Sequence, residues 1–262
     1  MPKANRSWHH IPMLRQICVF DTPSDLFRAA AEEFARCAVD ATKSSGQFTV
    51  ALSGGSTPRS LYALLASGII PGIPWPKSYF FWGDERHVPP DHLESNYHMV
   101  QEAMLAKVPV PRPNVFRIHC EESNASVAAR AYERDLTEFF HLAPGAFPRF
   151  DLVLLGLGPD GHAASLFPGT AALNETTHLV VANWVEELHT FRITLTYPVL
   201  NHAANVMFLV SGKDKAAIVR RVLEDPAANL PSQKIAPADG RLLWLLDREA
   251  SSALSPDTLS AG

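Results

Sequence analysis

Residues 150–162 read Phe150-Asp-Leu-Val-Leu-Leu-Gly-Leu-Gly-Pro-Asp-Gly-His162, and this stretch decides the fold. Val153 to Leu155 form a continuous apolar run, which is typical of a strand buried on both faces of a parallel sheet. Three glycines follow at the carboxyl edge, where open α/β sheets place their ligands. Asp160 and His162 lie in the same turn, and an imidazole titrates near neutral pH. We therefore expect a strand that brings a histidine to a pocket.

Two other interpretations of this stretch are open. Gly156 to Gly161 also match the dinucleotide pattern G-x-G-x-x-G, but that fingerprint needs a long helix directly afterwards. Pro168 and Gly169 interrupt the chain instead, and the strand-like segment 178–183 ends without an acid that could bind a ribose. The other interpretation is a structural histidine in a tight turn, with no chemistry.

Strand-like and helix-like segments alternate along the rest of the chain. Apolar runs predict strands at 17–20, 48–52, 78–82, 153–155, 178–182, 191–196, 205–210 and 241–246. Helical spacing and capping residues predict helices at 26–43, around 61–65, at 95–105, 123–140 and 213–223. This alternation predicts an α/β fold with a single doubly wound, mostly parallel sheet and helices on both faces. We expect one domain over residues 1–262, with its core at about 17–250 and short polar tails.

Composition excludes several classes of function. The chain has 262 residues, 47% of them hydrophobic, and a net charge of −4. It has no basic stripe, RNA-binding signature or zinc-ligand spacing, so we expect no nucleic-acid partner and no metal. No stretch approaches the roughly twenty apolar residues of a membrane helix, so we expect no membrane partner. The three cysteines are scattered, which suits free thiols in a reducing cytoplasm.

A second turn resembles a phosphate cradle. The strand at 48–52 runs into Ser53-Gly-Gly-Ser-Thr-Pro58, and a helix follows. Gly54 and Gly55 allow close backbone approach, the hydroxyls of Ser53, Ser56 and Thr57 can donate hydrogen bonds, and a helix N-terminus attracts anions. The Gly-Lys-Ser/Thr ending of a P-loop is missing, so we expect no triphosphate. A tight turn with capping residues is the alternative.

Charged residues follow two other strands. The aromatic strand at 78–82 ends in Gly83-Asp-Glu-Arg-His87, a group of charges that packing explains poorly. Lys215 opens the helix after the strand at 205–210, so it faces the same sheet edge as the glycine turns. A solvated loop for Asp84 and Arg86, and a solvated lysine at 215, are the structural alternatives.

Five blocks together resemble the 6-phosphogluconolactonases, within the glucosamine-6-phosphate deaminase-like superfamily. They lie in order along nearly the whole chain, and one small departure is Ala163, where many members carry threonine. The matching blocks are Ser53-Gly-Gly-Ser-Thr-Pro58, Gly83-Asp-Glu-Arg86, Gly156-Leu-Gly-Pro-Asp-Gly-His-Ala-Ala-Ser-Leu-Phe-Pro-Gly169, Arg192-Ile-Thr-Leu-Thr196 and Ser211-Gly-Lys-Asp-Lys-Ala216.

The resemblance implies a Rossmann-like fold of the deaminase/isomerase type. It also implies hydrolysis of a small sugar-phosphate lactone, 6-phosphoglucono-1,5-lactone, to 6-phosphogluconate in the oxidative pentose phosphate pathway, without metal or cofactor. We expect a monomer or a weak homo-oligomer in the cytoplasm.

Under this resemblance each candidate residue has a chemical role. His162 would be the general base and then the general acid, because an imidazole can do both at neutral pH. Asp160 and Asp84 are candidates to orient His162 or the substrate hydroxyls, and the sequence does not separate their roles. Arg86 would stabilise negative charge at the lactone. Arg192 and Lys215, with the turn at 53–57, would hold the phosphate.

The main alternative is the glucosamine-6-phosphate deaminase reaction, and a non-catalytic sugar-phosphate sensor is a third class. In the deaminases the histidine turn resembles Gly-His-Ile-Ala-Phe-Asn-Glu-Pro, whose glutamate is a catalytic partner of the histidine. Phe167 stands in the place of that glutamate, and phenylalanine cannot carry a proton. The deaminases also carry Asp-Glu-Tyr where this chain has Asp84-Glu-Arg86. Both differences favour the lactonase, and the presence of all the candidate polar residues argues against a sensor.

Overall fold

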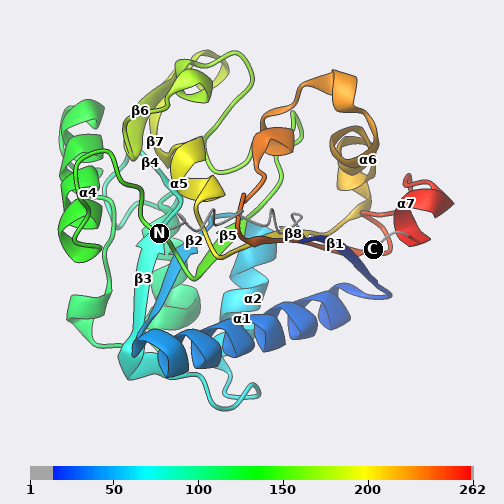
Figure 1. Ribbon diagram of the computed structural model, residues 1–262, viewed down its shortest axis with the longest axis horizontal. Coiled ribbons are helices and arrows are strands. Elements are labelled where there is room, and N and C mark those ends of the chain that lie inside the picture. Colours follow the sequence, from blue (N-terminus) through cyan, green and yellow to red (C-terminus); the bar gives the residue numbers. More distant parts are fainter. Residues whose placement is uncertain (1–13, 261–262) are drawn as a thin grey trace, which may run out of the picture.

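The centre of the molecule is a six-stranded sheet in a computed structural model that describes residues 14–260 (Figure 1). Neighbouring strands are parallel throughout, in the order β1-β9-β8-β5-β2-β3. The strands are β1 (Leu14–Phe20), β2 (Phe48–Leu52), β3 (Ser78–Trp82), β5 (Leu152–Leu155), β8 (Asn205–Val210) and β9 (Arg241–Asp247). Residues 1–13, which include most of the predicted N-terminal tail, lie outside the described residues.

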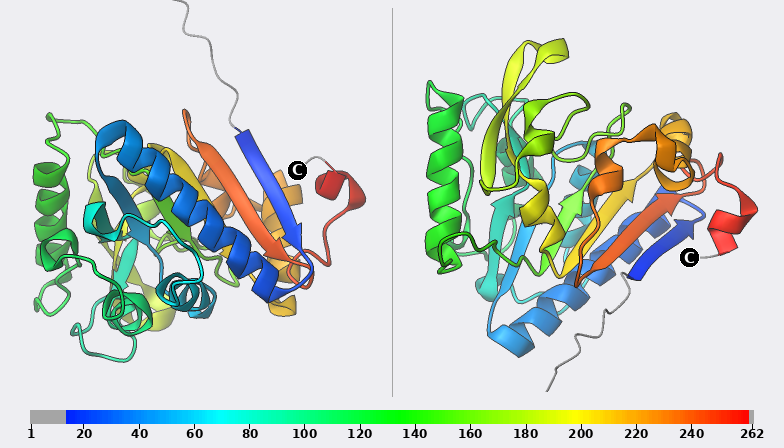
Figure 2. Two further views of the ribbon diagram at one scale, coloured as in Figure 1. Left: turned by 90° about the horizontal axis from the view of Figure 1, so that it is seen from below. Right: turned by 45° about the horizontal axis from the view of Figure 1, so that its top comes forward.

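Helices cover both faces of this sheet. Figures 1 and 2 show α1 (Pro23–Ser45) and α2 (Ser56–Ala66) on one face, and α5 (Tyr197–Asn201) and α6 (Ala216–Glu224) on the other. The other helices are α3 (Asn96–Val100), α4 (Ala125–Phe139) and α7 (Pro256–Ser260). The predicted α/β fold with a mostly parallel sheet between helices is confirmed. None of the helices in residues 14–260 is long and apolar enough to cross a bilayer.

Local chemistry explains where α1 begins and ends. The hydroxyl oxygen of Thr22 accepts a hydrogen bond from the backbone N–H of Asp25, at 3.2 Å, and Pro23 suits the first turn. Gly46, with φ +84°, ends the helix in the left-handed conformation. The helix therefore extends a few residues beyond both ends of the predicted range of 26–43.

Three short strands form a second, antiparallel sheet in the order β4-β7-β6, which corrects the expectation that all strands share one sheet. Its strands are β4 (Asp84–Arg86), β6 (Val180–Val185) and β7 (Thr190–Leu195). Only residues 186–189 join β6 to β7, and a parallel crossover needs a dozen residues or more, so the two strands form a hairpin. Asp84 to Arg86, predicted at the end of a strand, begin this separate sheet instead.

The order of the strands defines one crevice. The chain leaves β2 towards β3 on one side, and leaves β5 towards β8 on the other. The direction of winding therefore reverses between the neighbouring strands β2 and β5. Open α/β sheets bind ligands at such a reversal. All residues of both strands are buried, which holds the two following turns on a rigid base.

Candidate active site

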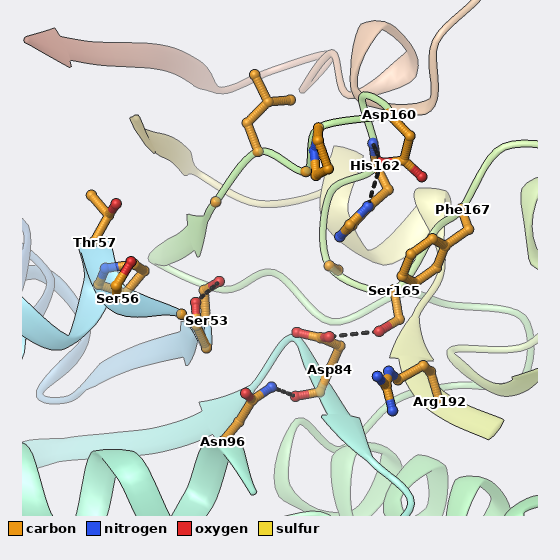
Figure 3. A pocket seen from close by; sticks show the side chains of 18 of the residues that line it. Ser53, Ser56, Thr57, Asp84, Asn96, Asp160, His162, Ser165, Phe167 and Arg192 are labelled. Carbon is orange, nitrogen blue, oxygen red and sulfur yellow. Dashed lines mark hydrogen bonds and ion pairs between the residues drawn. The ribbon is translucent and has the colours of Figure 1, made fainter. Parts of the chain in front are cut away.

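A pocket of about 600 Å³ opens at this crevice, between the turns after β2 and β5 and the small antiparallel sheet (Figure 3). The structure places all of the predicted site residues on its wall. These are Ser53, Gly54, Gly55, Ser56, Thr57, Asp84, Arg86, Asp160, His162, Arg192 and Lys215.

The turn after β5 holds His162 by its Nδ1 atom. The distance from Nδ1 to Oδ1 of Asp160 is 2.5 Å, and the same oxygen accepts the backbone N–H of His162 at 3.1 Å. Burial acts to raise the pKa of Asp160, but hydrogen bonding and charge from His162 outweigh it and leave that pKa below its usual value. An ionised carboxylate only accepts hydrogen bonds, so Nδ1 carries the proton and donates. In the neutral ring, Nε2 therefore keeps a free lone pair.

Packing fixes the plane of this imidazole. The ring stacks on Phe167, with centroids 4.0 Å apart and planes inclined by 28°. The backbone of Gly158 also approaches the ring so closely that a Cβ there would lie 2.1 Å from Nδ1 of His162. A residue without a Cβ is therefore needed at position 158 to leave room for the imidazole. The turn is closed by a hydrogen bond from the N–H of Gly158 to the carbonyl of His162, at 2.9 Å.

Strand β4 divides its three charged residues between two faces. Side chains alternate along a strand, so Asp84 and Arg86 share the face that lines the pocket. The carboxylate of Glu85, on the other face, is buried and accepts the backbone N–H groups of Asn96 and Tyr97, at 2.7 and 2.8 Å. Burial raises the pKa of Glu85, and these hydrogen bonds oppose that increase. Glu85 therefore anchors the start of α3 and takes no part in the pocket.

The two aspartates of the pocket have different partners, which the sequence did not reveal. Asp84 is buried, and its Oδ2 accepts a hydrogen bond from the hydroxyl of Ser165 at 2.6 Å (Figure 3). Its backbone carbonyl accepts the side-chain amide of Asn96 at 2.9 Å. Asp160 is therefore the aspartate that contacts His162, whereas the carboxylate of Asp84 contacts Ser165.

Cationic groups cluster on the side formed by the small sheet. Arg86 and Arg192 are directly opposite each other on β4 and β7. Arg86 donates from Nη1 to the carbonyl of Glu94 at 2.7 Å, whereas the guanidinium of Arg192 makes no hydrogen bond or ion pair within residues 14–260. Burial and the charge of Arg86 lower the pKa of Arg192. Two neighbouring cations on one wall of the pocket favour an anionic ligand.

The glycine turn after β2 is built for close approach. Tyr62 anchors it, because its hydroxyl donates to the carbonyl of Ser53 at 2.8 Å and accepts the N–H of Ser53 at 3.0 Å. Gly54 lies against Asn96, where a Cβ would come within 1.8 Å of the amide oxygen, and Gly55 has φ +103°. Helix α2 begins directly afterwards, and no side chain caps its N-terminus. The first N–H groups of α2 are therefore available to an anion.

Other residues of the pocket were not predicted. Asn96 and Ser165 connect Asp84 to α3 and to the turn after β5, and Ser211 follows β8. Ser165 lies within the motif at 156–169, yet no local pattern marks it as different from its neighbours. Its contact with Asp84 spans 81 residues, so only the folded chain reveals it.

The fold and the site together define an α/β protein whose pocket combines an oriented histidine with a group of cations. A sequence model of the family of glucosamine-6-phosphate isomerases and 6-phosphogluconolactonases matches residues 21–244. The chain belongs to this family.

Similar proteins include a 6-phosphogluconolactonase of the cyanobacterium Nostoc sp., 45% identical over 217 residues, which are 82% of this chain and 88% of that protein. A chloroplastic 6-phosphogluconolactonase of Arabidopsis thaliana is 39% identical over 92% of this chain and 75% of that protein. Among solved structures, 6-phosphogluconolactonase from Trypanosoma brucei has a TM-score of 0.83 and 30% identity, over 93% of this chain and all of that chain. A monomeric glucosamine-6-phosphate deaminase, 21% identical with a TM-score of 0.75, shares the fold.

Proposed function

We propose that this chain is a 6-phosphogluconolactonase, which hydrolyses 6-phosphoglucono-1,5-lactone to 6-phosphogluconate in the oxidative pentose phosphate pathway. One observation carries the proposal: Nδ1 of His162 is held by Asp160, so Nε2 is free to take a proton inside a pocket that also holds three cations. Relatives of that name cover most of the chain, which supports the same reaction.

The reaction needs an attacking water, stabilisation of the oxyanion and a proton for the leaving oxygen. Nε2 of His162 takes a proton from water while the water oxygen adds to the lactone carbonyl carbon. Arg86 stabilises the negative charge on the carbonyl oxygen. When the intermediate collapses, the bond from that carbon to the ring oxygen breaks, and the imidazolium returns its proton to the ring oxygen. The charge of Asp160 stabilises the imidazolium between the two steps.

The phosphate is held away from the histidine, at the turn after β2. The hydroxyls and N–H groups of residues 53–57 donate to it, and Lys215 and Arg192 supply charge. Asp84 faces the pocket beside Ser165, where its remaining acceptor sites suit substrate hydroxyls. Binding and bond cleavage thus depend on different residues, so variants of the two groups are expected to differ in their kinetics.

Replacement of Lys215 by alanine is expected to weaken the preference for the phosphorylated lactone. Loss of one charge-assisted hydrogen bond costs about 1.5–3 kcal/mol, or roughly 10- to 150-fold in kcat/KM. We expect this loss for 6-phosphogluconolactone, and little change for unphosphorylated gluconolactone. Lys213→Ala is the matched control, because Lys213 lies in the same short helical turn but is exposed and outside the pocket. An unchanged preference in Lys215→Ala would place the phosphate elsewhere.

The lactonase proposal also predicts that no ammonia is released from glucosamine 6-phosphate. Isomerisation has to move protons between carbon atoms, and in place of the deaminase glutamate this chain presents Phe167, stacked on His162. The measurement uses freshly generated lactone, corrected for spontaneous hydrolysis, beside an ammonia assay at the same enzyme concentration. Complete hydrolysis of the lactone without ammonia is expected. Stoichiometric ammonia with fructose 6-phosphate would overturn the proposal, and binding of the sugar phosphate without turnover of either would indicate a sensor.

We further propose a monomer or weak homo-oligomer that acts in the cytoplasm without metal, cofactor or nucleic acid. The net charge of −4 and the scattered free cysteines support this setting. Sedimentation at several protein concentrations tests the oligomeric state.

A further inference from the structure

Asp247 is a buried carboxylate that the proposed reaction does not use. It ends β9, is 1% exposed, and does not line the pocket. A buried charge is costly unless donors surround it, so its presence needs a reason. The donors come mainly from the loop that carries Lys215.

Strand register brings Asp247 to this loop. Val210 pairs with Leu246 in the parallel ladder of β8 and β9, so the residues that follow, Ser211 and Asp247, lie side by side at the carboxyl edge. The hydroxyl of Ser211 donates to Oδ2 of Asp247, and the N–H of Gly212 donates to both carboxylate oxygens, at 3.0 and 3.2 Å. The N–H of Ala250 donates to Oδ1 at 2.7 Å. Every donor is polar and neutral, so the carboxylate is held by dipoles.

These hydrogen bonds determine the course of the chain towards Lys215. Gly212 has φ +103°, and its carbonyl accepts the backbone N–H of Lys215 at 3.1 Å. Among the described residues, 14–260, the ammonium of Lys215 has only a loose ion pair with Asp214, at 3.9 Å. Side-chain contacts therefore hold Lys215 weakly, and the backbone of residues 211–215 decides where its ammonium lies. That backbone is fastened to the sheet through Asp247.

We propose that Asp247 is a positioning residue for the phosphate end of the pocket. By holding Ser211 and Gly212, it aims Lys215 at the substrate phosphate, and it touches neither the substrate nor His162. This inference rests on the proposed function. It predicts that loss of the carboxylate weakens phosphate binding while leaving the bond-breaking step intact.

Asp247→Asn in the full chain tests the proposal. The amide replaces one acceptor oxygen by an N–H₂ group, which faces the N–H donor of Gly212 in either orientation of the amide. We expect KM for 6-phosphogluconolactone to rise about 10-fold and kcat to stay within about twofold, with unphosphorylated gluconolactone unaffected. The dissociation constant of glucose 6-phosphate, measured by calorimetry, is expected to rise by the same factor. This binding measurement needs no turnover, so it remains informative even if the proposed reaction is wrong.

A double variant separates positioning from general stability. If Asp247 acts through Lys215, Asp247→Asn adds little to the effect of Lys215→Ala, whereas independent effects multiply. Asp151→Asn is the matched control, because the Asp151 carboxylate also accepts a backbone N–H and a hydroxyl, both from Thr49 at 2.8 Å, at the start of β5. The control is expected to lower the melting temperature without a selective change in KM.

The proposal is overturned if Asp247→Asn reduces kcat for both lactones, or if its effect multiplies with that of Lys215→Ala. Should Asp247→Asn fail to fold, Gly212→Ala provides a second test. Gly212 has φ +103°, a conformation that residues with a Cβ rarely adopt, so this variant strains the same loop and leaves Asp247 in place. The same selective loss of phosphate binding is expected, and unchanged binding of glucose 6-phosphate would contradict the role of the loop.

Discussion

His162→Ala is expected to lower kcat for 6-phosphogluconolactone by roughly 10²- to 10⁴-fold, which is the usual contribution of a positioned acid–base group. The variant removes the Nε2 atom that takes and returns the proton in the proposed reaction, together with the partner of Asp160. KM is expected to change little, because the proposed phosphate contacts are residues 53–57, Arg192 and Lys215. Steady-state kinetics on fresh lactone, corrected for spontaneous hydrolysis, measure both constants.

His119→Ala is the control for this experiment, because His119 is an exposed histidine outside the pocket. It is expected to retain full turnover. Asp160→Asn is expected to show an intermediate loss of kcat, since an amide still holds the ring but stabilises the imidazolium less. Turnover by His162→Ala close to that of the unmodified protein would remove His162 from the mechanism.

Gly158→Ala is expected to lower kcat about 100-fold, although it removes no polar group of the site. The added Cβ would lie 2.1 Å from Nδ1 and 2.2 Å from Cε1 of His162, so the ring has to leave its position against Phe167 and Asp160. A displacement of about 1 Å of a catalytic group is sufficient for a loss of this size. The measurement is kcat together with the melting temperature, which shows whether the variant is folded.

The same turn offers a matched control in Gly156→Ala. A Cβ at Gly156 meets nothing closer than the hydroxyl of Ser53, at 3.9 Å, which is an ordinary contact, and its φ is not in the left-handed region. We expect a much smaller loss of kcat than in Gly158→Ala. Equal losses in the two variants would show that the turn tolerates no side chain at all, and would contradict a specific role for the space beside His162.

The chain divides its charged residues between the pocket and the surrounding structure. Within β4, Asp84 and Arg86 face the pocket while Glu85 anchors α3. Asp247 ends β9 and Asp151 directly precedes β5, and neutral donors hold both carboxylates. Of the two, only Asp247 holds a loop of the pocket. The residue type alone therefore does not identify a carboxylate of the pocket, and its position in the folded chain does.

Most of the secondary structure and the location of the pocket could be predicted from the sequence. Strands β2 and β5 are largely apolar runs, which are typical of strands buried on both faces, so the pattern favours a parallel sheet covered by helices. The turns at 53–57 and 156–162 follow those runs directly. Parallel strands end at the same edge, so these two turns had to meet there.

Tertiary structure decided the second sheet and the partners within the site. The strands at 180–185 and 190–195 have ordinary strand patterns. They form a sheet of their own because a short connection makes them a hairpin and because β7 pairs with β4. Asp84 and Asp160 were equivalent candidates to orient His162. The hydrogen bond between Asp160 and His162 spans two residues, whereas the one between Ser165 and Asp84 spans 81. A local pattern determines helices, strands and turns because their interactions join residues that are close in sequence. Contacts between distant residues depend on strand register, and the packing of the whole chain sets that register.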